Sequence, residues 1–152
     1  MTSTQLDSLK DLFDRDLTRL MEELKLFKDT SDLWVTPGTI SNSAGNLILH
    51  ICGNLQHFIG FVLGQTGYAR QRDLEFSSKN VPVDELNEQI LATKEAVLLT
   101  LNKMSPAALE ETYPLEIWQR NLSIGFFLVH LHSHLNYHLG QINYLRRILQ
   151  TS

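Results

Sequence analysis

The chain has 152 residues, 43% of them hydrophobic and 20% charged, which is typical of one globular domain covering residues 1–152. A formal net charge of -4 without a dense basic cluster argues against nucleic-acid binding. The single cysteine excludes an intramolecular disulfide, and the sequence has neither a signal-peptide pattern nor an apolar run long enough to cross a bilayer. We therefore expect a cytoplasmic protein with no nucleic-acid or membrane partner.

Residues 5–28 have the pattern of an amphipathic helix. Apolar side chains recur every three or four residues with charged residues between them, so one face is expected to be buried. The segment 29–42 is expected to be a loop, because it opens with Asp and Ser and carries a Pro-Gly turn signal. The apolar positions of this first helix are Leu6, Leu9, Phe13, Leu17, Leu20, Leu24 and Phe27.

A second helix is expected to begin at an N-cap, Ser41 or Ser43, and to run to about Gly64. Its apolar residues cover much of its circumference, so we expect it to be largely buried. Cys52 lies inside this apolar run and is expected to act as a small hydrophobic residue.

A polar connection over residues 66–80 leads to a third helix, which Pro82 starts and which runs to about Lys103. Ser105 followed by Pro106 is typical of an N-cap with proline at the first helical position, and predicts one short turn.

The stretch 111–120 is expected to be irregular or briefly extended, and a last helix follows it, capped by Asn121 or Ser123 and ending near Leu149. Four long helices with almost no strand signal predict an all-α four-helix bundle. Long connections are expected between helices 1 and 2, 2 and 3, and 3 and 4.

Histidines are concentrated on the last helix. His130, His134 and His138 recur at four-residue spacing and therefore share one helix face. Two imidazoles so placed can bind one transition-metal ion, with metal–nitrogen bonds of about 2.0–2.1 Å. The second helix offers a third donor, His50 or His57. Spacing alone selects neither the pair nor the third donor, and histidines hydrogen-bonded to polar neighbours are the competing interpretation.

Three segments carry a resemblance to a known family. The stretch SAGNLILHICGN at 43–54 and the stretch HLNYHLGQI at 134–142 resemble the DinB/YfiT-like superfamily, whose members are four-helix-bundle, metal-dependent enzymes. The segment 70–76 is similar to a linker in one branch of that family. The resemblance covers essentially the whole chain, and order, spacing and helix placement agree.

The resemblance implies a three-histidine metal site. Carried over position by position, it makes His50, His134 and His138 the ligands of a divalent transition metal, zinc or nickel. His57 and His130 then become neighbours of the site. Three neutral imidazoles around one ion leave a position open for water or substrate, which is typical of catalytic sites.

Residues beside these histidines give further expectations. Gly140 inside a helix costs about 1 kcal/mol relative to Ala, which indicates close approach of another helix. Gln141 either hydrogen-bonds across the bundle or faces solvent, and Asn54 is placed to orient the second-helix imidazole. No carboxylate neighbours a histidine in the sequence, so no general base can be named.

The function implied by the resemblance is metal-dependent hydrolysis, or transfer using a low-molecular-weight thiol, on a small-molecule substrate. We expect the chemistry at one end of the bundle, near the Trp34 loop and the 111–120 connection. A homodimer is also expected, because the second and last helices look apolar over more than one face, with the resemblance carrying part of this expectation. The alternative is a non-catalytic metal-binding or stress-related dimeric helical interaction module.

Overall fold

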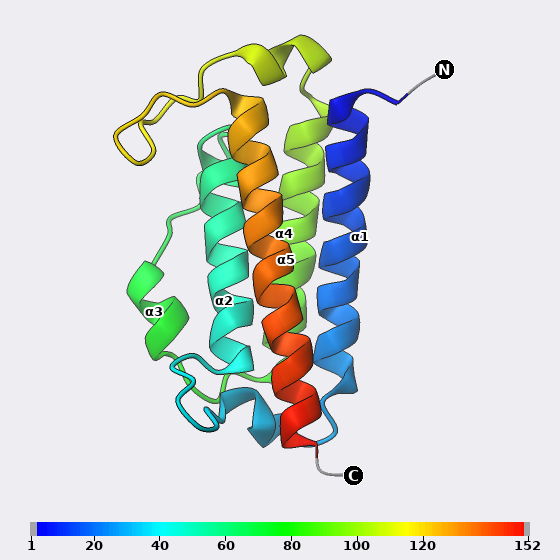
Figure 1. Ribbon diagram of the computed structural model, residues 1–152, viewed down its shortest axis with the longest axis vertical. Coiled ribbons are helices and arrows are strands. Elements are labelled where there is room, and N and C mark those ends of the chain that lie inside the picture. Colours follow the sequence, from blue (N-terminus) through cyan, green and yellow to red (C-terminus); the bar gives the residue numbers. More distant parts are fainter. Residues whose placement is uncertain (1–2, 151–152) are drawn as a thin grey trace.

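The computed structural model describes residues 3–150 and consists of four long helices standing side by side (Figure 1). These helices are α1 (Gln5–Leu26), α2 (Ala44–Leu55), α4 (Val83–Asn102) and α5 (Ile124–Leu149). The only β-type pairing in the described part is two isolated bridges in the connection before α5. The predicted all-α four-helix bundle with long connections is therefore confirmed.

Side-chain caps fix where the helices begin. Thr4 and Asp7 form a capping box at the start of α1, in which each side chain bonds the other residue's backbone N–H. Of the alternative caps, the structure uses Ser43 for α2 and Ser123 for α5, whose side chains accept from Asn46 N–H and Phe126 N–H.

The second long helix changes its hydrogen-bond register before it ends. We predicted one helix to about Gly64, but α2 stops at Leu55 and a π-helical segment, Gln56–Phe61, continues it. In this segment, for example, Val62 N–H bonds the carbonyl of His57, five residues earlier. The spacing of apolar residues does not change at this π-helical segment, so the sequence does not predict it.

A short helix, α3 (Arg72–Ser77), lies within the predicted polar connection and packs beside α2 (Figure 1). Two further turns, Thr30–Trp34 and Pro106–Glu110, are 3-10 helices, the second at the predicted Ser-Pro signal. The sequence does not reveal α3, because six residues are too few to show a helical period.

The core is built from the predicted faces. All seven apolar positions of the first helix are buried, and so is every residue of α2. Cys52 is 1% exposed, and burial raises the pKa of its thiol to about 12. The thiol is therefore neutral at pH 7 and acts as a small hydrophobic residue, as predicted.

Close helix approaches occur at glycines other than the one we predicted. A Cβ at Gly140 would meet no atom within 4 Å, so the expected neighbouring helix is absent there and that prediction is wrong. At Gly45 a Cβ would lie 2.7 Å from the Trp34 indole, which covers this end of α2. At Gly53 it would overlap the carboxylate of Glu75, so that carboxylate can lie against α2 in this position only because residue 53 lacks a side chain.

None of the helices within residues 3–150 combines the length and the apolar character that crossing a membrane requires.

Candidate metal centre

Three imidazoles from two helices meet between α2 and α5. His50 lies in the middle of α2, and His134 and His138 lie one turn apart on α5. The Nε2 atom of His134 is 3.2 Å from that of His50 and 3.1 Å from that of His138. These are the three ligands that the resemblance implied, and the structure brings them together as a group able to hold a metal ion.

Hydrogen bonds to residues outside the cluster fix which ring nitrogen of His50 and of His138 faces His134. His50 Nδ1 lies 3.0 Å from a carboxylate oxygen of Glu75, and His138 Nδ1 lies 2.7 Å from the amide oxygen of Gln141. Both oxygens only accept hydrogen bonds, so both Nδ1 atoms carry the hydrogen. In neutral imidazoles the Nε2 atoms of His50 and His138 are then bare lone pairs aimed at His134.

This arrangement fits a metal ion better than it fits hydrogen bonding. His134 Nε2 carries at most one hydrogen, so for neutral rings at least one of the two short nitrogen–nitrogen contacts has no hydrogen between its atoms. Two nitrogens bound to one tetrahedral zinc ion lie about 3.3 Å apart, close to both observed separations. A divalent cation would relieve the lone-pair repulsion and leave its fourth position free.

Two of the three imidazoles, those of His134 and His138, have lowered pKa values and are neutral at pH 7. Burial, reinforced by the neighbouring His138 and His50, lowers the pKa of His134 to about 3. Burial also lowers the pKa of His138, against the opposing hydrogen bond to Gln141. Because protons and metal ions compete for the same lone pairs, neutral rings at pH 7 are ready to bind a cation.

A carboxylate that sequence reasoning missed supports His50. Glu75 of α3 accepts from His50 and from both Nε and Nη2 of Arg70, at 2.9 Å each. Burial alone would raise the pKa of Glu75, but the bonds from His50 and Arg70 outweigh it and lower that pKa. Glu75 thus stays ionised, and it orients the ring as carboxylates beside metal-bound histidines do.

Two amides near the site behave differently from each other. Gln141 binds His138 within α5, three residues away, rather than across the bundle or in solvent. Asn54 does not orient His50, because Glu75 takes that role. The side-chain oxygen of Asn54 is buried without a hydrogen-bond partner.

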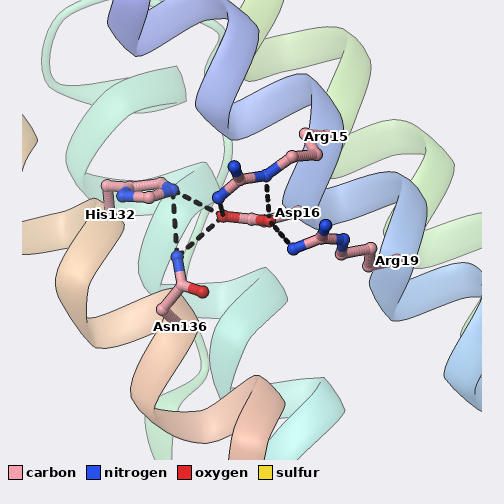
Figure 2. A network of polar contacts seen from close by, with 5 residues as sticks. All are labelled: Arg15, Asp16, Arg19, His132 and Asn136. Atoms are coloured by element: carbon pink, nitrogen blue, oxygen red, sulfur yellow. Dashed lines mark hydrogen bonds and ion pairs between the residues drawn. The ribbon is translucent and has the colours of Figure 1, made fainter.

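The remaining histidines lie outside the cluster. His57 stacks on Phe61, with ring centroids 5.9 Å apart. His130 packs edge-on against the exposed Trp118, at 4.6 Å between centroids. His132 leaves α5 on another flank and bonds Asp16 of α1 at 2.7 Å (Figure 2).

A pocket of about 570 Å³ adjoins the cluster, with His138 and Gln141 in its wall. Residues 39–42, at the end of the loop that contains Trp34, form another part of this wall. The stretch 111–120 contributes none of the residues that line it and lies at the opposite end of the bundle from the 29–42 loop (Figure 1). The expectation of chemistry at one end of the bundle near both connections is therefore wrong.

The sequence was compared with models of protein families and with curated proteins. The family model described as the DinB superfamily matches residues 12–142, which include all three clustered histidines and Glu75. No match was found among curated proteins.

Proposed function

Because this chain belongs to the DinB superfamily, we propose that it is a metal-dependent enzyme whose zinc or nickel ion is held by His50, His134 and His138. One observation carries the proposal. His50 and His138 donate their Nδ1 hydrogens to Glu75 and Gln141. Their Nε2 lone pairs therefore point to the place where a cation would bind.

The chemistry follows from the ligand set. Imidazole suits both zinc and nickel, and an ion with three such ligands lowers the pKa of a water or thiol that it binds. Glu75 and Gln141 hold two rings in place, and the adjoining pocket admits a small molecule beside His138. We therefore propose hydrolysis or thiol transfer on a small-molecule substrate, in the cytoplasm.

The alternative is a non-catalytic metal-binding or stress-related dimeric interaction module. A closed fourth ligand would favour it. Among the described residues the cluster has three donors rather than four, and a pocket reaches one of them, which favours the enzyme.

The first test is metal content. Protein purified without an affinity tag is expected to carry one divalent ion per chain, and His138→Ala to lose it while keeping its helical circular-dichroism spectrum. His130→Ala and His57→Ala are the matched controls: the His130 ring lies 6.4 Å from that of His134 between centroids, and His57 interacts electrostatically with Glu75 and Arg70, but neither belongs to the cluster. Retention of the ion in His138→Ala, with its loss in either control, would show that we have chosen the wrong ligands.

The second test is the open coordination position. Nickel-loaded protein offered small thiols should develop thiolate-to-nickel charge-transfer absorption, because a thiol displaces water from the fourth site. Turnover of electrophiles that depends on added thiol would support transfer. If neither thiols nor carboxylates change the spectrum, the interaction module replaces the enzyme.

We also propose a homodimer, formed through α5. Every residue of α2 is buried by the rest of the chain, so α2 has no exposed apolar face for a partner. The proposal therefore rests on α5. Outside the pocket beside His138, its first half presents two large apolar side chains to solvent, Phe126 (51% exposed) and Val129 (45% exposed).

Light scattering is expected to give twice the chain mass of 17.4 kDa at micromolar concentration. Val129→Lys should shift the protein toward the monomer, because a lysine in an apolar interface must lose its hydration. Leu91→Lys on α4 is the control, since Leu91 is exposed to a similar degree. A wild-type monomer across a dilution series would refute the dimer.

A further inference from the structure

The pocket beside His138 is lined, apart from His138 itself, by aliphatic, aromatic and uncharged polar side chains. Its walls come from residues 39–42, from Leu47 of α2 and from the C-terminal half of α5. They supply hydroxyl and amide groups together with aliphatic and aromatic surface. Among its described lining residues there is no Asp, Glu, Lys or Arg.

The only imidazole among the lining residues belongs to the histidine cluster. His138 lies in the cluster, and its ring is held in one orientation by Gln141. Arg147 stands near this end of α5, but its guanidinium lies over the Tyr144 ring, 5.7 Å from the centroid, and does not line the pocket. A charged ligand group placed in the part of the pocket away from His138 would lose water without gaining an oppositely charged side chain.

The size of the pocket suits a small organic molecule. Its volume of about 570 Å³ falls within the range of about 300–1,000 Å³ that is usual for ligand pockets. Tyr137 and Tyr144 line it from successive parts of α5, and Ile40 lines it from the 29–42 loop. These groups offer apolar contact with a few hydrogen-bonding positions at the edges.

We propose that this pocket binds the uncharged, apolar body of the substrate, whose reactive group reaches the metal. The inference rests on the proposed function and narrows it. It selects neutral aromatic or aliphatic substrates against thiols or esters that carry a carboxylate or ammonium group on the part of the molecule away from the reacting atom.

A matched series of thiols tests the inference by binding rather than by activity. The probes are benzyl mercaptan, its para-carboxylate and its para-aminomethyl derivative, titrated into nickel-loaded protein and followed by charge-transfer absorption. The three share one donor and one ring and differ in charge. We expect the neutral probe to bind at least about tenfold more tightly than either charged one.

A charge introduced into the wall should change this preference. Ile40→Lys places an ammonium at the pocket, and we expect it to reverse the order between the neutral and the carboxylate probe. Val35→Lys is the control, because Val35 is 40% exposed, close to the 41% of Ile40, and belongs to the same connection without lining the pocket.

The outcomes separate the inference from the function on which it rests. If all three probes bind equally, or if Ile40→Lys behaves like Val35→Lys, the pocket does not select neutral ligands and the inference fails alone. If the metal is bound but no probe changes its spectrum, the open coordination position is refuted, and the inference falls with it.

Discussion

Replacing Asp16 with Ala is expected to lower the free energy of unfolding by about 3 kcal/mol, the lower end of what removing one partner of a buried ion pair costs. Asp16 is fully buried in α1, and Arg15, His132 and Asn136 bond its carboxylate (Figure 2). The lower end applies because Arg15 is about half exposed and regains water when its partner is lost.

The same carboxylate gives the effect a pH dependence. Burial alone would raise the pKa of Asp16, but hydrogen bonds from Arg15, Asn136 and His132 outweigh it and hold the pKa below its ordinary value of 3.8. A carboxyl whose pKa is depressed on folding stabilises the protein above its unfolded pKa. That contribution is lost as the pH falls through the folded-state value, so wild type and Asp16→Asn should converge in stability below about pH 3.8.

Urea unfolding at pH 7 and in acid measures both effects. Asp14→Ala is the matched control in the same helix, because its ion pair with Lys94 is half exposed and such pairs contribute about 0–1 kcal/mol. Folded Asp16→Ala should still bind the metal, since α1 supplies none of the clustered histidines. If Asp16→Ala and Asp14→Ala lower the free energy of unfolding equally, the buried ion pair of Asp16 contributes no more than the exposed pair of Asp14.

The parts of the fold that could be predicted are those with a repeating apolar pattern. The first helix carries seven apolar positions at helical spacing, and all seven are buried. The register shift at Gln56–Phe61 leaves that spacing unchanged, so a continuous helix was predicted across it. α3 was not predicted because its six residues are too few to show a helical period, and because its one buried residue is a glutamate, which is ordinarily taken as a sign of the surface.

The site could be predicted only as far as local spacing and family resemblance reach. His134 and His138 are one turn apart on one helix, so their proximity follows from helix geometry. The choice of His50 over His57 came from the resemblance. Glu75 is 25 residues from His50 in the chain, and their contact depends on how α3 folds against α2. Gly53, which makes room for that carboxylate, was the local sign of it.

Glu75→Gln is expected to weaken metal binding by about 10–100-fold, the usual effect of losing a carboxylate behind a metal-bound histidine. The amide keeps the shape of the side chain but removes the negative charge of the carboxylate, which accepts hydrogen bonds from both His50 and Arg70. Competition with a zinc chelator at pH 7 measures the affinity. Asp73→Asn, an exposed change in the same short helix, should bind as wild type does.

Gly53→Ala tests the same contact from the opposite helix. A methyl group there would overlap the Glu75 carboxylate, so the side chain must move and His50 loses its fixed orientation. We expect a weaker affinity in the same direction as for Glu75→Gln, with thermal unfolding of the metal-free protein reporting any damage to packing. If both variants fold and bind zinc as tightly as wild type, Glu75 only fastens α3 to α2, and the ring of His50 is positioned by the core alone.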